Sequence, residues 1–188
     1  MDNNALLKKE LENFPTAGLK GDVLLIETAA LKALEVSLTS IKDLTDRGFR
    51  VMVLSASRPC TNLINLYEKW RIDLEKIHII DCVCHSQGLK TEDSKMVTHV
   101  SSIRNLTDIS LLITKIFKDV KEPTVLFIDS ITTMLLYSNE EVFSLFLHNI
   151  LTRMRDKGVN VLLLMVDTVG SNLRSDLIQL CDKTIGLK

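Results

Sequence analysis

Residues 124–130 read Thr124-Val-Leu-Phe-Ile-Asp129-Ser130. The four consecutive apolar residues of this stretch, two of them β-branched, are typical of a strand that is buried on both faces of a sheet. The stretches from Asp22 to Glu27 and from Asn160 to Val166 have the same character. Strands of this kind occur where helices cover both faces, so the pattern predicts a parallel sheet between two helical layers.

The rest of the chain alternates between strand and helix patterns. We expect further strands at 50–55, 76–81 and 183–187, and helices at 31–47, 59–70, 105–120, 139–157 and 171–180. Asn105 and Asn139 are expected to cap two of these helices. Residues 82–100 show no clear period and are expected to form a long loop. The whole chain, 1–188, is therefore interpreted as a single three-layer α/β domain with a mainly parallel sheet, and residues 1–17 as a helical N-terminal extension.

Hydrophobic residues recur at helical spacing in two of the predicted helices. The helix at 31–47 carries an apolar stripe of Leu31, Leu34, Leu38, Ile41 and Leu44. The helix from Asn139 is apolar over a wider surface than one buried stripe needs, with Val142, Phe143, Leu145, Phe146, Leu147, Ile150, Leu151 and Met154. Excess apolar surface of this kind indicates either a partner interface or a helix packed deeply among its neighbours.

The composition excludes several classes of protein. The chain has 23 Lys and Arg against 24 Asp and Glu, with the two signs interspersed, so no basic surface for nucleic acid is expected. The N-terminal residues lack the apolar core of a signal peptide, and no apolar run approaches the roughly 18–20 residues of a membrane span. The sequence therefore predicts a cytoplasmic protein without a nucleic-acid or membrane partner.

The four cysteines are Cys60, Cys82, Cys84 and Cys181. Cys82-Val-Cys84-His85 looks like a fragment of a metal site, but zinc sites usually have two to four residues between paired cysteines. No second Cys/His pair follows at a suitable spacing, and the nearest further candidates are His99 and Cys60. We therefore expect reduced thiols at the end of a strand and no metal site.

Polar residues follow the predicted strands, where ligands bind in an open parallel sheet. The site candidates at these ends are Glu27, Thr28, Ser55, Ser57, Arg58, Asp129, Ser130 and Asp167, and Asp81 ends a further strand. The predicted crevice is thus polar and mostly acidic. Arg58 is expected either to pair with Glu27 or Asp129, or to bind an anion, or to lie in solvent at the start of a helix.

Val125-Leu-Phe-Ile-Asp129-Ser130 resembles the Walker B strand of the RecA/KaiC-like ATPases. The order of the strands and the closing segment from Cys181 to Leu187 are similar to the same superfamily, from about Gly18 to the C-terminus. Shorter strings, Ser57-Arg-Pro59, Ile79-Ile-Asp81 and residues 101–108, resemble uncharacterised archaeal KaiC-like proteins. The resemblance implies a RecA/P-loop NTPase-like fold, self-association, and a Walker-B-like strand next to the first strand, which makes Glu27 and Asp129 neighbours.

The residues after Ile26 depart from that superfamily. A phosphate loop, G-x-x-x-x-G-K-S/T, cradles phosphate with glycine backbone N–H groups and a lysine. The chain instead reads Glu27-Thr-Ala-Ala-Leu-Lys32, without glycine and without Ser or Thr after the lysine. The glutamate expected after the second strand is also missing. We therefore expect no ATP or Mg²⁺ cofactor, because Asp129 alone does not hold Mg²⁺-nucleotide without the phosphates and the loop hydroxyl.

Two functions remain open from the sequence. The first is a catalytically degenerate RecA/KaiC-like domain that acts as a regulatory or scaffold protein, through a protein partner or self-association. The alternative is weak binding or hydrolysis of a nucleotide or another small ligand in the crevice, with Glu27 and Asp129 sharing a proton or a cation. In a third interpretation Asp129 is only a Walker B relic, hydrogen-bonded to the backbone and to Thr28 or Ser130.

Overall fold

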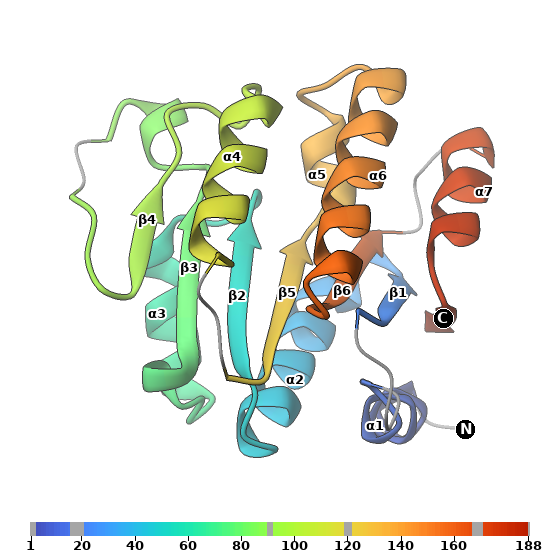
Figure 1. The fold of residues 1–188 in the computed structure, drawn as a ribbon. Helices are drawn as coiled ribbons and strands as arrows, with labels where there is room; N and C mark the ends of the chain where they lie inside the picture. The colour runs from blue at the N-terminus through green and yellow to red at the C-terminus, as the bar shows by residue number, and fades with distance from the viewer. Residues whose placement is uncertain (1–2, 16–20, 90–91, 119–121, 167–170, 188) are drawn as a thin grey trace.

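The computed structural model describes residues 3–15, 21–89, 92–118, 122–166 and 171–187. In this part of the chain, parallel strands form one seven-stranded sheet in the order β4-β3-β2-β5-β6-β1-β7. The strands are β1 (Val23–Thr28), β2 (Arg50–Ser55), β3 (Ile77–Asp81), β4 (Val97–His99), β5 (Thr124–Asp129), β6 (Asn160–Val166) and β7 (Lys183–Leu187). Helices cover both faces, which confirms the predicted three-layer α/β fold (Figure 1).

The two faces of the sheet bury separate apolar cores. One face packs against α1 (Asn3–Glu12), α2 (Ala33–Asp46) and α3 (Cys60–Lys69), and the other against α4 (Leu106–Ile116), α5 (Ile131–Leu135), α6 (Glu140–Asp156) and α7 (Ser171–Leu180). Because side chains alternate along a strand, β1 sends Leu24 and Ile26 to the α1–α3 core and Leu25 to the α4–α7 core. This alternation explains the continuous apolar runs that the sequence shows.

The predicted caps of two long helices are confirmed. The Asn105 side chain accepts a hydrogen bond from the backbone N–H of Asp108 at the start of α4. The Asn139 side chain accepts one from Glu141 at the start of α6, where Glu140 and Glu141 also face the positive end of the helix dipole.

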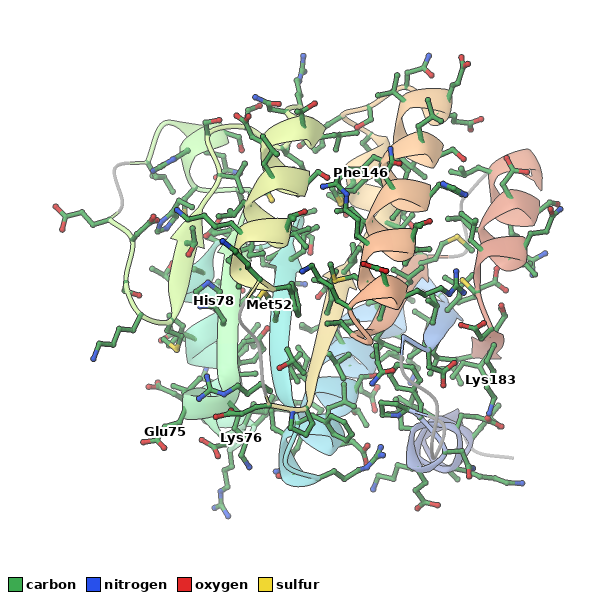
Figure 2. All side chains as sticks on the ribbon, in the orientation of Figure 1. Met52, Glu75, Lys76, His78, Phe146 and Lys183 are labelled. Atoms are coloured by element: carbon green, nitrogen blue, oxygen red, sulfur yellow. The ribbon has the colours of Figure 1, made fainter. Side chains whose placement is uncertain are left out.

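Glu75 and Lys76 lie just before β3, at the amino end of that strand (Figure 2). Lys76 Nζ donates to the backbone oxygen of Thr45 at 2.8 Å and lies 3.4 Å from a carboxylate oxygen of Asp73. Lys76 is therefore engaged by contacts within the chain at the amino end of β3.

The N-terminal helix is part of the packed structure. Leu7, Leu11 and Phe14 are buried in the α1–α3 core, where α1 lies against α2 and β7. None of the helices in the described residues is both long enough and apolar enough to cross a membrane.

Two short elements lie where the sequence pattern predicted none. β4 spans three residues within the predicted 82–100 loop and pairs with β3, and α5 spans five residues after β5. Elements this short do not complete a recognisable period of hydrophobic residues, so sequence periodicity does not detect them.

The prediction for Leu31 is wrong. Leu31 is 97% exposed, although its spacing placed it on the buried stripe of the following helix. It lies in a 3₁₀ turn, Ala30–Lys32, and α2 begins only at Ala33. The helical period therefore starts after Leu31, and Leu38, Ile41 and Leu44 form the buried stripe.

The Walker-B-like strand is not the neighbour of the first strand, contrary to prediction. β1 pairs with β6 and β7, whereas β5 pairs with β2 and β6. β6 lies between them because its apolar residues, Val161 to Met165, are buried on both faces in the middle of the sheet. Glu27 and Asp129 therefore end strands that are two positions apart.

Gly21, just before β1, provides a test of the packing of α6 on the sheet. It has a φ of +77°, and a Cβ there would lie 2.6 Å from the Cα of Arg155. We expect Gly21→Ala to lower the free energy of unfolding by about 2–4 kcal/mol, because left-handed strain adds to a backbone clash. Gly48→Ala is the matched control, with a φ of +91° and no atom within 4 Å of the added Cβ.

In Gly48→Ala the free energy of unfolding should fall by only about 1–2 kcal/mol, which is the cost of the left-handed strain alone. Urea unfolding followed by circular dichroism measures both variants. Equal losses for the two variants would contradict the close approach of α6 at Gly21.

Candidate functional site

Glu27, the fifth residue of β1, is held by Arg174 of α7. Arg174 Nε lies 2.6 Å from Glu27 Oε1, and Nη2 lies 2.8 Å from Oε2. This is a bidentate pair, in which both the charge and the geometry of the carboxylate are matched by the guanidinium. The Glu27 side chain is only 11% exposed, so its charge is satisfied inside the fold.

Asp129 ends β5 and is buried on the opposite face of the sheet. Its Oδ2 accepts a hydrogen bond from Ser37 Oγ of α2 at 2.8 Å. Burial raises the pKa of Asp129, and the Ser37 hydrogen bond and the positive charge of Arg58 oppose this effect. The hydroxyl partner of Asp129 is therefore Ser37, and not Thr28 or Ser130 as the relic interpretation predicted.

The Glu27 and Asp129 carboxylates point away from each other. Leu25, two residues before Glu27, belongs to the α4–α7 core, and Phe127, two residues before Asp129, belongs to the α1–α3 core. Because alternate residues share a face, the two carboxylates leave opposite faces of the sheet. They do not form the shared proton or cation site that the sequence alternative required.

The other predicted site residues make local contacts. Ser130 caps α5 by accepting a hydrogen bond from the backbone N–H of Thr133, and Ser55 Oγ donates to the backbone oxygen of Arg58 at 2.8 Å. Thr28 is buried, and its hydroxyl has no hydrogen-bond partner among the described residues.

Arg58, half-buried, acts on Asp129 through its charge, while Ser57 is exposed. Of the alternatives left open for Arg58, pairing with Glu27 is wrong, because Arg174 takes that place, and the interaction with Asp129 is the one that the structure supports. Asp167 lies outside the described residues.

A cavity of about 540 Å³ lies beyond the carboxyl ends of β2, β3 and β5. Its polar lining consists of hydroxyl and amide groups and one guanidinium, from Ser57, Ser86, Gln87, Ser102, Arg104, Thr133 and Tyr137. Among the described residues no carboxylate lines it, although the sequence predicted an acidic crevice. The described carboxylates at this edge are turned into the two faces of the sheet, where each has its own partner.

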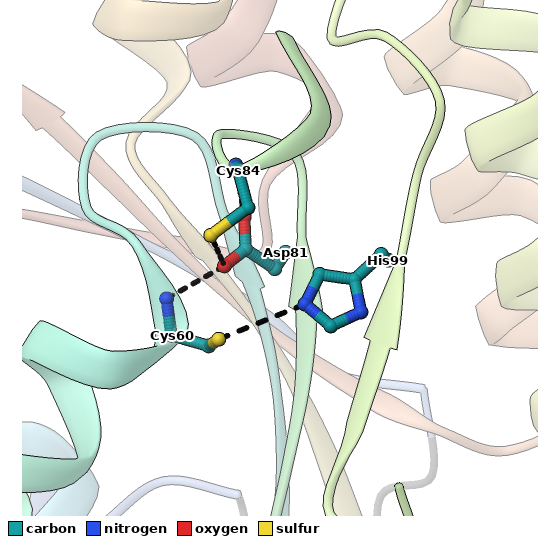
Figure 3. Close-up of side chains that lie close together, drawn as sticks. All are labelled: Cys60, Asp81, Cys84 and His99. Carbon is teal, nitrogen blue, oxygen red and sulfur yellow. Dashed lines mark hydrogen bonds between the residues drawn. The ribbon is translucent and has the colours of Figure 1, made fainter. Parts of the chain in front are cut away.

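A second cluster, which we call the thiol cluster, joins Cys60, Asp81, Cys84 and His99 (Figure 3). Asp81 and His99 end the adjacent parallel strands β3 and β4 and are register partners. Cys60 is the first residue of α3, and Cys84 lies in the turn after β3. The cluster is therefore assembled from four places along 40 residues of chain by the pairing of β2, β3 and β4.

Asp81 organises the turn that carries Cys84. Its Oδ1 accepts hydrogen bonds from the backbone N–H groups of Val83 at 2.7 Å and Cys84 at 2.9 Å, and its Oδ2 accepts one from Cys60 at 2.6 Å. Burial raises the pKa of Asp81, but these hydrogen bonds outweigh it and the net pKa is lowered. Asp81 is thus a carboxylate in the folded protein.

The two thiols of the cluster are protonated in the absence of a cation. Burial, the hydrogen bond with Asp81 and its negative charge raise the pKa of Cys60 to about 12. The same causes raise the pKa of Cys84, whose Sγ donates to Asp81 Oδ2 at 3.1 Å. These thiols are therefore poor nucleophiles as they stand.

His99 is oriented from outside the cluster. Its ring is 2% exposed, and its Nδ1 lies 3.0 Å from Asp93 Oδ1, which also accepts from the His99 backbone N–H at 2.8 Å. Its Nε2 faces Cys60 Sγ at 3.7 Å, and the ring of His85 stacks on it with centroids 5.2 Å apart. Sequence reasoning named Cys60 and His99 as metal candidates but could not unite them, because β4 was not predicted.

The buried Asp129–Ser37 contact can be tested by substitution. Ser37→Ala should lower the free energy of unfolding at pH 7 by about 1–3 kcal/mol, because a buried carboxylate loses a hydrogen bond. Ser40→Ala is the matched control, since Ser40 Oγ donates only within α2, to the backbone oxygen of Val36. Ser40→Ala should lower the free energy of unfolding by clearly less than Ser37→Ala does.

Asp129→Asn should raise the melting temperature at pH 7. A carboxyl whose pKa is raised on folding costs stability as pH rises from its unfolded pKa towards its folded pKa, and the amide removes this cost. Melting temperatures of Asp129→Asn and of the unchanged protein between pH 4 and 8 would check this, and a less stable Asn variant throughout would contradict it.

No family model and no curated protein matches the sequence. Solved structures do match. An uncharacterised protein of Pyrococcus horikoshii, crystallised with an unknown peptide, has a TM-score of 0.68 and 13% identity over 95% of this chain and 82% of its own. A KaiC-like protein of the hyperthermophilic archaeon Pyrococcus horikoshii has a TM-score of 0.63 and 16% identity over 89% of this chain and 71% of its own. At these identities the likeness shows the fold alone, which is RecA/KaiC-like.

Proposed function

We propose that this chain is a RecA/KaiC-like domain that does not use ATP and that acts, as a regulatory or scaffold protein, through protein contacts. The observation that carries this proposal is the backbone after β1. The strand ends at Thr28, Ala29 is extended, and the chain enters a 3₁₀ turn at Ala30 and α2 at Ala33. The connection is too short and too regular to wrap round a phosphate group.

Backbone dihedral angles support this interpretation. A phosphate nest aims successive N–H groups at an anion by combining right-handed and left-handed residues. Among the described residues, positive φ occurs at Gly21, Gly48, Arg71, Gly88 and Gly158, and so at none between β1 and the end of α2. The segment that stands in place of a phosphate loop therefore has no nest.

The charges near this segment also support the proposal that the chain does not use ATP. Lys32 Nζ lies 3.6 Å from Glu35 Oε2 on the exposed surface, and Arg174 is engaged by Glu27. A triphosphate placed here would lie near the Glu27 carboxylate, and Arg174 could neutralise the phosphate charge only by leaving its bidentate pair with Glu27.

Isothermal titration with Mg-ATP and with a non-hydrolysable analogue tests the first half of the proposal. We expect no binding up to millimolar nucleotide, and no rise in melting temperature. A micromolar dissociation constant would overturn it. If nucleotide binds, Arg104→Ala locates the site. Loss of nucleotide binding in this variant would favour the alternative function, which is a small-anion site in the 540 Å³ cavity.

The proposal that the chain acts through protein contacts rests on the surface between α4 and α6, which we call the α4–α6 face. Leu111, Val142 and Leu145 are 60%, 55% and 61% exposed there. They line a groove of about 300 Å³ together with Leu106 and Phe146, with the neutral polar groups of Thr107, Ser110 and Asn149, and with the guanidinium of Arg153 at one end. Val142 and Leu145 are the residues of α6 that exceed its buried stripe, as the wide apolar pattern of the sequence indicated.

A second copy of this chain is the occupant that we propose for the α4–α6 face. The formal net charge of −1 gives little repulsion between copies at neutral pH, and the resemblance to RecA/KaiC-like proteins implies self-association. A protein of this fold has also been crystallised with a peptide, which is a precedent for polypeptide binding by the fold.

Multi-angle light scattering over protein concentrations from micromolar to millimolar tests whether the chain associates with itself through the α4–α6 face. The mass should rise with concentration, and Leu145→Glu should keep the protein monomeric, because a buried unpaired charge opposes association. Leu136→Glu is the matched control, since Leu136 is 79% exposed and does not line the groove. A strict monomer, or equal loss with the control, would contradict self-association through this face.

A further inference from the structure

The thiol cluster offers the ligand chemistry of zinc. Two sulfurs, one imidazole nitrogen and one carboxylate oxygen, from Cys60, Cys84, His99 and Asp81, lie within 4.8 Å of one another. Zinc holds four such atoms in a tetrahedron at about 2.0–2.3 Å, which puts the ligands roughly 3.3–3.8 Å apart. Cys60 Sγ and His99 Nε2 are 3.7 Å apart, and Cys84 Sγ and Asp81 Oδ2 are 3.1 Å apart. We propose that these four side chains bind one zinc ion.

The orientation of His99 is an independent observation that points to a cation. Nδ1 lies 3.0 Å from the Asp93 carboxylate, which leaves Nε2 as the ring nitrogen that faces the other ligand atoms. Histidines that bind metals are typically oriented in this way, by a carboxylate on the nitrogen that is turned away from the metal. Asp93 is thus a positioning residue and not a ligand.

The zinc site is closed and is built into the sheet. Cys60, Asp81 and Cys84 are 5%, 0% and 1% exposed, and the ring of His99 is 2% exposed. Four protein ligands leave no open position for a substrate, which is the arrangement of a structural site. On binding, the two thiol protons pass to solvent and the sulfurs bind as thiolates, so that the ion with two thiolates and one carboxylate has a net charge of −1.

The ion would stabilise the least regular edge of the protein. β4 has three residues and pairs with β3 alone, and the described part of the connection between them contains only a 3₁₀ turn, His85–Gln87. Zinc would link the end of β3, the turn after it, the end of β4 and the start of α3. This inference does not rest on the proposed function, because the cluster is separate from the segment after β1.

Metal content and cobalt spectroscopy test the proposal. Protein purified under reducing conditions should contain one equivalent of zinc by mass spectrometry of the metal. Protein stripped with a chelator should melt at a lower temperature, and added Co²⁺ should give the thiolate charge-transfer and strong visible bands of tetrahedral cobalt. Because the cobalt spectrum is recorded on the unchanged sequence, it does not depend on whether variants fold.

Variants assign the ligands. Cys60→Ser, Cys84→Ser and His99→Gln should each abolish the tetrahedral cobalt spectrum, and Asp93→Asn should weaken zinc affinity roughly 10–100-fold while keeping the spectrum. Cys181→Ser is the matched control, because Cys181 lies outside the cluster, and it should change neither.

Two results would overturn the zinc site. The first is a reduced protein with four titratable thiols that takes up neither zinc nor cobalt. The second is a Cys60–Cys84 disulfide, found by mass spectrometry in protein protected from air, which would assign the pair to redox chemistry.

Discussion

Burial of the parallel sheet on both faces is the constraint on which the rest of the structure depends. A strand in such a sheet has no solvent side, so a carboxylate near its end needs a partner on the face to which its position directs it. Glu27 finds Arg174 of α7, Asp129 finds Ser37 of α2, and Asp81 finds three backbone N–H groups. These three carboxylates are thereby engaged in contacts within the fold.

The same packing on both faces of the sheet forms the fold whatever chemical groups its loops carry. The sheet, its two helical layers and the start of α2 form without a glycine-rich loop after β1, because the apolar strands and helix faces supply the packing. The fold alone does not determine the function, which depends on the chemical groups at the carboxyl edge of the sheet. There, the cavity lined by Arg104 and hydroxyl groups and the apolar α4–α6 face remain exposed to partners.

The sequence predicts those parts of the fold that carry a long, strong pattern. β2, β5 and β6 have the predicted bounds, because continuous apolar runs mark them, and β7 and α7 also have the predicted bounds. The short elements β4 and α5 were missed. The order of the strands does not follow from periodicity. The expected contact between Glu27 and Asp129 was wrong because it assumed that β5 is the neighbour of β1, whereas β6 lies between them.

The thiol cluster shows why spacing alone misdirects in a sheet protein. Cys82 and Cys84 suggested a metal fragment together, but they point to opposite cores, since they are two residues apart in a turn and not on one continuous strand. The true neighbours of Cys84 are Cys60 and His99, which are brought in by β2–β3–β4 pairing. A sequence pattern contains the residue types of such a cluster and does not contain its geometry.

The turn after β3 connects the two sites that the structure brings out. Cys82, Val83, Ser86 and Gln87 line the 540 Å³ cavity, while Cys84 of the same turn faces the thiol cluster on the other side. The Asp81 carboxylate holds this turn by its hydrogen bonds to Val83 and Cys84. The thiol cluster and one wall of the cavity are therefore built from a single hydrogen-bonded turn at the end of one buried strand.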